Sequence, residues 1–161
     1  MKALSKIAAG VSPSATLAVS ALAKKMKAEG KDVIGFGAGE PDFATPDRIS
    51  YAGVRAICDG KTRYTPAAGM IELRQAICDR AKADYGLEYE ATQAVVASGA
   101  KHTVYIALAA LVDPGDEVIV PAPYWVSYYE MVRLFGGVPV VVNVSEEQGF
   151  QLTPEQLEQA I

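Results

Sequence analysis

The stretch VVASGAKHTVYIALAALVDPGDEVIV, residues 95–120, decides the fold of this chain. A run typical of a strand leads through Ser-Gly-Ala-Lys into a helix-like segment, and Asp-Pro-Gly-Asp separates that segment from a second strand-like run. The glycine turn lies where a strand passes into a helix, which is where α/β proteins often hold a phosphate. The backbone N–H groups of Ala100, Lys101 and His102 would then face an anion. A plain turn that binds nothing stays open, because no longer phosphate fingerprint is present.

The alternation of strand-like and helix-like segments continues to the end of the chain. The predicted order is strand 94–98, helix 101–111, strand 117–120, helix 126–135 and strand 138–144. The strands are nearly continuous apolar runs, as in parallel sheets that are buried on both faces. A capping box from Thr153 to Gln156 then predicts another helix. We therefore expect an α/β protein, the N-terminal part of a doubly wound, mainly parallel sheet that is incomplete at the C-terminus.

The first half of the chain has a different pattern, with helices separated by longer loops. The segments expected there are a helix over 14–29, a short strand over 33–37, a helix from a Thr45 cap with Pro46 as its first residue to about Asp59, and a helix from Met70 to about Asp84 that Gly86 ends. The loops GAGEPDFATP and KTRYTPAAG connect them.

Composition excludes several classes of function. Half of the 161 residues are hydrophobic, 21% are charged and the net charge is −4, which fits a folded domain and does not point to nucleic acid or an anionic membrane. No stretch approaches the roughly 18 apolar residues of a membrane span. Cys58 and Cys78 lack disulfide-framework or metal-ligand spacing, so we expect reduced thiols, no metal site and a cytoplasmic location.

Three aromatic side chains are candidates for binding, although each also has an ordinary explanation. Trp125 follows Pro-Tyr after a predicted strand, where it could stack on a flat cofactor or fill the core beneath a loop. Tyr64 lies in a loop, with a polar tip on an aromatic ring. His102 has no carboxylate or nucleophile at triad-like spacing, so packing or a place on the surface at a helix end is the simpler explanation.

Taken together, five motifs in order closely resemble the first part of the fold-type I, class I/II aminotransferases that use pyridoxal phosphate. They are Gly-Glu-Pro-Asp-Phe from Gly39, Tyr-x-Pro-x-x-Gly from Tyr64, Gly-small-Lys from Gly99, Asp-Pro-Gly-Asp from Asp113 and Pro-Tyr-Trp from Pro123. The similarity is closest to the bacterial-type aspartate aminotransferases, and it covers essentially every residue from Ser12 to Ile161. It implies the pyridoxal-phosphate transferase fold.

The resemblance implies a role in binding pyridoxal 5'-phosphate for five residues. The backbone of Gly99, Ala100 and Lys101 would hold the cofactor phosphate, and Trp125 would stack on the pyridine ring. Ala100 stands where the family often has glycine, and its methyl group fits if the residue is already helical. Tyr64 would reach the phosphate in the neighbouring subunit, which implies a homodimer.

The resemblance also implies a substrate site. Gly39 would lie beside the substrate together with Trp125, and Ser14, Thr16 and Lys101 would bind the distal carboxylate of an acidic amino acid. The implied reaction moves the amino group of aspartate, or of another amino acid, to a 2-oxo acid such as 2-oxoglutarate. Residues 1–45 would belong to the small domain, and residues 46–161 to the first part of the large cofactor-binding domain.

No catalytic residue of that family is expected within this chain. The lysine that forms a Schiff base with the cofactor is expected beyond Ile161, so the chain alone is predicted to be inactive and its parent protein to be the enzyme. Two alternatives stay open: a truncated relative that acts as a binding or dimerisation module, and an unrelated α/β domain that binds a nucleotide or phosphate.

Overall fold

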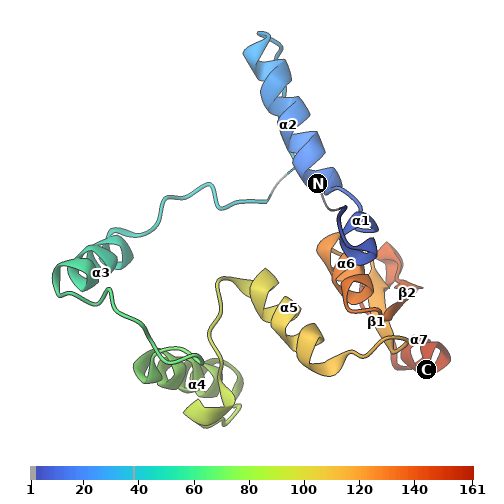
Figure 1. Cartoon of the computed structure of the whole chain (residues 1–161). Helices are drawn as coiled ribbons and strands as arrows, with labels where there is room; N and C mark the ends of the chain where they lie inside the picture. Colours follow the sequence, from blue (N-terminus) through green and yellow to red (C-terminus); the bar gives the residue numbers. More distant parts are fainter. Residues whose placement is uncertain (1–2, 38) are drawn as a thin grey trace. The chain divides into compact units, whose positions relative to one another are not determined.

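The computed structural model describes residues 3–37 and 39–161, and its elements are labelled in Figure 1. The chain divides into two compact units. Unit 1 combines Met1–Gly39 with Val104–Ile161, and unit 2 is Glu40–Thr103. Helix α5 (Ala100–Leu111) begins in unit 2 and continues into unit 1.

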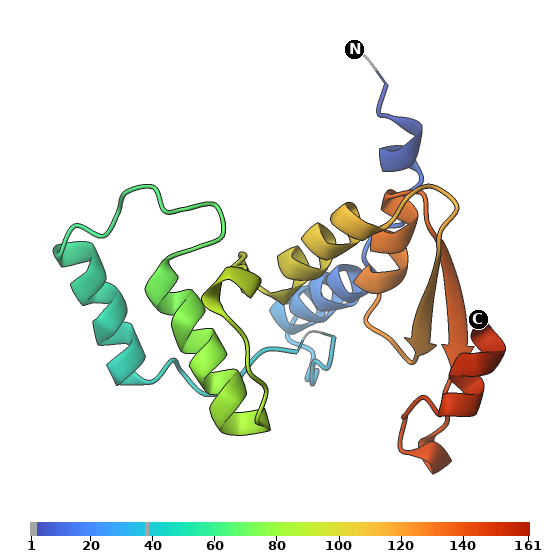
Figure 2. The ribbon, with the colours of Figure 1, turned by 90° about the horizontal axis from the view of Figure 1, so that it is seen from below.

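Two parallel strands form the centre of unit 1. Strand β1 (Glu117–Ala122) pairs with β2 (Val138–Asn143) in a register that runs from Glu117 opposite Val138 to Ala122 opposite Asn143. Helix α6 (Ser127–Leu134) connects them, and Figure 2 shows the two strands side by side and pointing the same way. This βαβ unit confirms the predicted helix and the predicted parallel pairing of these two strands.

The core of unit 1 lies between α6 and these strands. Val132 is 1% exposed, and Met131, Val120 and Val144 are also buried. Gly137 lets the chain turn closely beneath the helix, because a Cβ atom there would lie 2.9 Å from Val132 Cγ1. Apolar burial of this kind is the main stabilising contribution to such a layer.

The remaining elements of unit 1 begin at residues that cap them. These elements are α1 (Lys6–Ala9), α2 (Ala15–Ala28), η2 (Glu146–Gln148) and α7 (Pro154–Ala160). Thr153 and Gln156 form the predicted capping box of α7, with proline at the first turn. A hydrogen bond from its own backbone and another from the Thr153 side chain hold the pKa of Glu155 below its usual value. The helix predicted over 14–29 is confirmed as α2, with Ser14 as its N-cap.

Unit 2 is built on helices. It contains α3 (Asp47–Cys58), α4 (Ile71–Tyr85), the short helix η1 (Ala91–Gln93) and the first residues of α5. Helix α4 ends at Gly86 in the left-handed conformation, as predicted. The predicted Thr45 cap is wrong by one residue. Pro46 is itself the N-cap of α3 with ψ 138°, so the helix starts at Asp47.

Two predicted strands do not form among the described residues. The segment 33–37 lies against α2 instead, where a Cβ atom on Gly37 would be 3.0 Å from Val19 Cγ1. The segment 94–98 makes only isolated contacts, since Val96 N–H donates to Ala68 O at 3.0 Å. An apolar run indicates that a strand is possible, but a strand exists only where a neighbour completes its hydrogen-bond ladder.

The contact between Val96 and Gly69 gives a test of packing in unit 2. Gly69 has φ +97°, and a Cβ atom there would lie 2.8 Å from Val96 Cβ. Gly60 has φ +72° with nothing within 4 Å. We expect Gly60→Ala to lower the free energy of unfolding by about 1–2 kcal/mol through backbone strain alone. Gly69→Ala should lower the free energy of unfolding by about 2 kcal/mol more than Gly60→Ala does, because Val96 must also move. Urea titration of both variants measures the difference, and equal losses would contradict the close contact.

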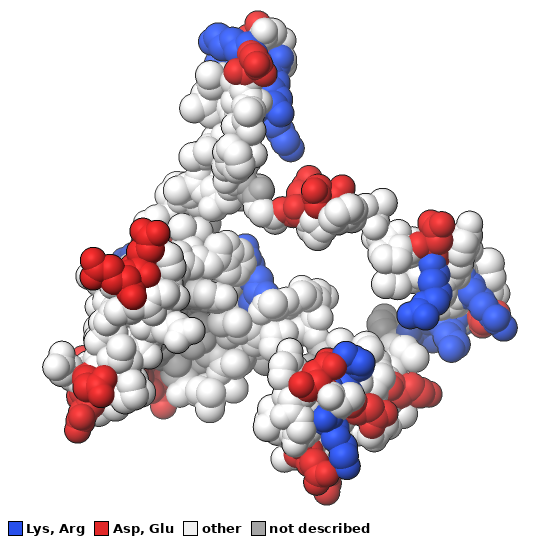
Figure 3. All heavy atoms as spheres, turned by 180° about the vertical axis from the view of Figure 1, so that it is seen from behind, with Lys and Arg blue, Asp and Glu red and all other residues white. Residues whose placement is uncertain are grey.

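The surface carries charges of both signs beside wide apolar areas. Figure 3 shows acidic and basic side chains next to each other on several elements, separated by uncharged surface. Ion pairs such as Arg55–Asp59 at 3.6 Å are exposed and so contribute only about 0–1 kcal/mol each. Phe36, Phe43 and Leu111 are all at least 80% exposed. Within the described ranges, no helix is long and apolar enough to cross a membrane.

Candidate functional site

The turn at Gly99 has the backbone geometry that an anion site needs. Gly99 adopts φ +84°, a conformation that favours glycine, and α5 begins at the next residue, Ala100. No acceptor among residues 3–37 and 39–161 takes the N–H of Ala100. The positive end of a 12-residue helix lies behind that group. The expectation for His102 is wrong in one respect, because its N–H donates to Gly99 O at 3.1 Å and does not face outward.

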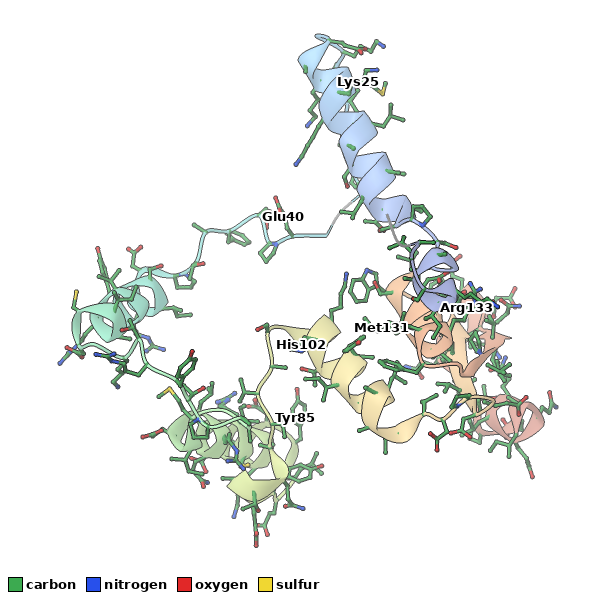
Figure 4. All side chains as sticks on the ribbon, viewed as in Figure 1. Lys25, Glu40, Tyr85, His102, Met131 and Arg133 are labelled. Carbon is green, nitrogen blue, oxygen red and sulfur yellow. The ribbon has the colours of Figure 1, made fainter. Side chains whose placement is uncertain are left out.

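The His102 side chain accepts a hydrogen bond from the backbone just before Gly99. Ser98 N–H donates to His102 Nδ1 at 3.3 Å, and Figure 4 places His102 at the start of α5. An accepting Nδ1 carries no proton, so a neutral ring has its proton on Nε2. The prediction of a surface histidine at a helix end is confirmed, because His102 is exposed in the first turn of α5, but it did not include this hydrogen bond. The signal that could have found this contact is the position of His102 as the third residue of the helix, where capping-box side chains reach back to the preceding backbone.

Unit 2 anchors the segment that leads into the turn. Arg74 Nε donates to Ala94 O at 2.8 Å in a partly buried setting, which ties this segment to α4. Val96 is bonded to Ala68, as described above. Thr103 Oγ1 also donates to Gly99 O at 3.3 Å. Helix, loop and turn are thus linked by hydrogen bonds around the backbone of the proposed phosphate site.

Tyr64 extends from the surface of unit 2. Its side chain is fully exposed, at 107%, in the loop between α3 and α4. Among the described residues it has no hydrogen-bond or ring partner. The structure does not bring Tyr64 into contact with the turn at Gly99 within its own unit. An exposed phenol of this kind is available to a ligand or to another chain.

In unit 1, the aromatic candidate follows the end of β1. The chain passes through a cis Ala122–Pro123 bond to Trp125, and Tyr128 N–H then donates to Trp125 O at 3.0 Å. Trp125 is 40% exposed as a residue, and its ring meets Tyr128 edge-on, with centroids 5.6 Å apart. Trp125 also lines a groove of about 550 Å³ between α5 and β1. It is neither buried in a core nor fully solvated, which is compatible with stacking on a flat ligand.

A second groove, also of about 550 Å³, brings the N-terminal segment to the residues that flank Trp125. Ser14 is in one wall, and Tyr124 and Val126 are in the other. Ser14 Oγ accepts the N–H of Leu17 at 3.4 Å to cap α2, and its own O–H can still donate to a ligand.

The two other N-terminal candidates are placed differently. Thr16 is half-buried in the first turn of α2 and does not line the second groove. Gly39 is exposed, and nothing lies within 4 Å of where its Cβ would be, so this chain alone does not explain a glycine there. Of the three proposed substrate residues in the N-terminal segment, Ser14 lines the groove beside Tyr124 and Val126, whereas Thr16 and Gly39 do not.

Sequence reasoning missed Glu130 on α6. Its Oε2 accepts the N–H of Ser12 at 3.4 Å, and its Oε1 lies 3.5 Å from Arg133 Nη1. The two bonded residues, Ser12 and Glu130, are 118 positions apart. No local pattern could predict such a contact, because it depends on the packing of the first residues against α6.

Comparisons with known proteins place these features in a family. Residues 31–161 match the family model for class I and II aminotransferases. The chain is 52% identical over 158 residues to an aspartate aminotransferase from Geobacillus stearothermophilus, covering 98% of this chain and 40% of that protein. It is 54% identical over 161 residues to an aspartate/prephenate aminotransferase from Cereibacter sphaeroides, covering 100% of this chain and 40% of that protein.

A solved structure agrees. An aspartate aminotransferase from Thermus thermophilus, determined with maleate, matches with a TM-score of 0.95 and 44% identity, over 100% of this chain and 42% of that one. The match confirms the expected fold class. The chain spans about 40% of the length of the curated relatives it matches.

Proposed function

The chain belongs to the class I and II aminotransferases, and from this premise we propose that the full-length protein is a pyridoxal-phosphate-dependent aspartate aminotransferase. It would move the amino group of aspartate to a 2-oxo acid such as 2-oxoglutarate. The observation that carries the proposal is the identity of 52% to a relative named aspartate aminotransferase, over 98% of this chain. That alignment spans nearly all of the residues assigned above to cofactor and substrate.

The residues present fit the proposed cofactor. A phosphate would accept the Ala100 N–H at the positive end of α5, and Gly99 has no side chain to obstruct its approach. Ala100 is already helical, so its methyl group is compatible with this role. Trp125 offers ring surface for a pyridine ring. When bound, pyridoxal phosphate withdraws electrons from the carbon that carries the amino group, and the protein supplies orientation and charge.

The proposed substrate contacts would favour acidic amino acids. The Ser14 O–H can donate to a carboxylate, and the Lys101 ammonium would pair with the same charge. Thr16 and Gly39 keep their proposed roles from the family resemblance alone. These residues bind and orient the substrate, and the groups that move protons belong to other parts of the proposed enzyme.

Lys101→Met tests the preference for acidic substrates. We expect kcat/KM for aspartate to fall about 10- to 100-fold, which corresponds to the loss of a charge-assisted hydrogen bond. The value for an apolar amino acid should fall much less. Steady-state kinetics with both substrates measures the ratio, and Lys24→Met on the exposed surface of α2 is the control. Equal losses for both substrates would instead assign Lys101 to the cofactor site.

A homodimer is part of the proposal. The full exposure of Tyr64 is compatible with a reach into a partner's cofactor site. Sedimentation of the holoenzyme during turnover tests this, and a catalytically active monomer would contradict it.

The domain division after residue 45 and the cytoplasmic location are proposed as well. Cys58 is exposed and Cys78 is buried, and both are free thiols.

The direct test of the function is spectroscopic. The purified full-length protein should bind pyridoxal phosphate with a visible absorbance band that shifts when aspartate is added and returns with 2-oxoglutarate. A stable protein of 17.0 kDa with no such band would support the alternative of a binding or dimerisation module. A bound nucleotide would support the unrelated phosphate-binding domain.

Prephenate is a second candidate amino-group acceptor. The Cereibacter relative, 54% identical over the whole chain, is named an aspartate/prephenate aminotransferase. The assay uses aspartate as donor and compares prephenate with 2-oxoglutarate as acceptor. Turnover with 2-oxoglutarate alone would restrict the activity to the first proposal.

A further inference from the structure

The first residues of the chain are held to α6 by the carboxylate of Glu130. Ser12 N–H donates to Glu130 Oε2 at 3.4 Å. Ser12 lies two residues before Ser14, whose hydroxyl caps α2 and lines the groove beside Tyr124. A contact that fixes the backbone of Ser12 therefore also limits where the Ser14 hydroxyl can lie.

Neighbouring groups orient this carboxylate. Arg133 Nη1 lies 3.5 Å from Glu130 Oε1, so the two carboxylate oxygens have different partners. The Arg133 guanidinium is also 5.9 Å from the ring centre of Tyr129, which limits its movement. The Glu130 side chain is only 23% exposed. Figure 4 shows Arg133 on α6 beside the first residues of the chain.

The walls of two grooves meet at Glu130. The larger is the groove that Ser14 lines, and the smaller, of about 130 Å³, lies between α6 and residues Lys6 to Val11. Glu130 is thus at the junction between the start of the chain and the segment that carries Ser14. Among the described residues, this bond adds to the contacts along the grooves, and loop backbone that lacks such a bond opens more readily.

We propose that Glu130 is a positioning residue for substrate recognition, acting through Ser12 on Ser14. It holds the N-terminal segment so that the Ser14 O–H is in place for the distal carboxylate of an acidic substrate, and it does not touch the substrate itself. This inference rests on the proposed function, since it takes Ser14 as a substrate residue. We expect the contact between Ser12 and Glu130 to stabilise the bound substrate and the transition state equally. Loss of the contact should therefore raise KM and leave kcat unchanged.

The test is a double-mutant cycle in the full-length holoenzyme. Glu130→Ala removes the acceptor, and Ser12→Pro removes the donor N–H at a position already followed by proline. Each single change should raise KM for aspartate about 5- to 10-fold with kcat nearly unchanged, as expected for one net hydrogen bond. The double variant should equal either single one, because both remove the same interaction. Glu130→Gln keeps an acceptor oxygen and should restore most of the affinity.

A second readout does not depend on activity. Lys6 is the first residue of the short helix α1, and trypsin should cleave after it faster when the segment is no longer held to α6, so Glu130→Ala should speed that cleavage. Glu147→Ala, on exposed η2, is the matched control and should change neither the rate of cleavage after Lys6 nor KM for aspartate.

Three outcomes would overturn the inference: additive effects in the cycle, failure of Glu130→Gln to restore KM, or unchanged cleavage after Lys6. If the wild-type protein binds no pyridoxal phosphate, the proposed function fails instead. The cleavage experiment still tests the contact between Ser12 and Glu130 in that case, so the two failures are distinguishable.

Discussion

Gly99→Val should weaken the binding of pyridoxal phosphate by about 100-fold. Valine at φ +84° is strained, since a β-branched side chain disfavours the left-handed region. We expect the backbone to relax by rotating out of that region, which would turn the Ala100 N–H away from the proposed phosphate position. The loss of a charge-assisted hydrogen bond and the loss of its alignment with the helix dipole together should weaken the binding free energy by roughly 3 kcal/mol.

Gly86 provides a matched control in the same unit. It has φ +69° at the end of α4, and as at Gly99 nothing lies within 4 Å of where a Cβ atom would be. Both valine substitutions should lower the free energy of unfolding by a similar amount, about 1–3 kcal/mol. Only Gly99→Val should change the cofactor dissociation constant, measured by titrating the apoenzyme. An equal loss of affinity in both variants would mean that the turn at Gly99 is only a connection between segments.

The elements that the sequence predicts well are those whose evidence is local. Helices α4 and α5 and the β1–α6–β2 unit follow from apolar spacing and from glycines such as Gly86 and Gly99, which act on their immediate neighbours. The strand expected over 94–98 has the same apolar signal. It does not form, because pairing requires a neighbouring strand, and the backbone there bonds to Ala68 and Arg74 instead.

The residues of the candidate site also differ in whether a local signal in the sequence is sufficient to predict them. The glycine turn before α5 and the tryptophan after β1 could be found from the sequence, because a glycine at the start of an apolar helix pattern and an aromatic residue soon after a strand are both local signals. The ring contact of His102 with Ser98 could have been found from helix position, but not from a search for catalytic triads. The bond between Ser12 and Glu130 could not, since it joins residues 118 positions apart. Residues that form a site can be recognised by local signals. The contacts that support those residues depend more strongly on tertiary packing and are harder to predict.

Trp125→Ala should lower kcat/KM for aspartate about 50-fold, mainly through weaker cofactor binding. Stacking of a flat heterocycle on an aromatic side chain contributes about 1–3 kcal/mol. The Trp125 ring is supported edge-on by Tyr128, which presents it in one orientation and reduces the entropy lost on binding. Trp125→Phe keeps an aromatic face and should retain activity within a few-fold of the wild-type value.

The same pair of variants separates stacking from simple packing. If Trp125 only fills space beneath the loop that follows β1, alanine should reduce the unfolding free energy of the apoenzyme and leave the dissociation constant of pyridoxal phosphate unchanged. If it stacks on the cofactor, the dissociation constant should rise strongly while the apoenzyme loses little stability, because Trp125 is already 40% exposed. Equilibrium dialysis of the cofactor, together with urea unfolding of the apoenzyme, distinguishes the two.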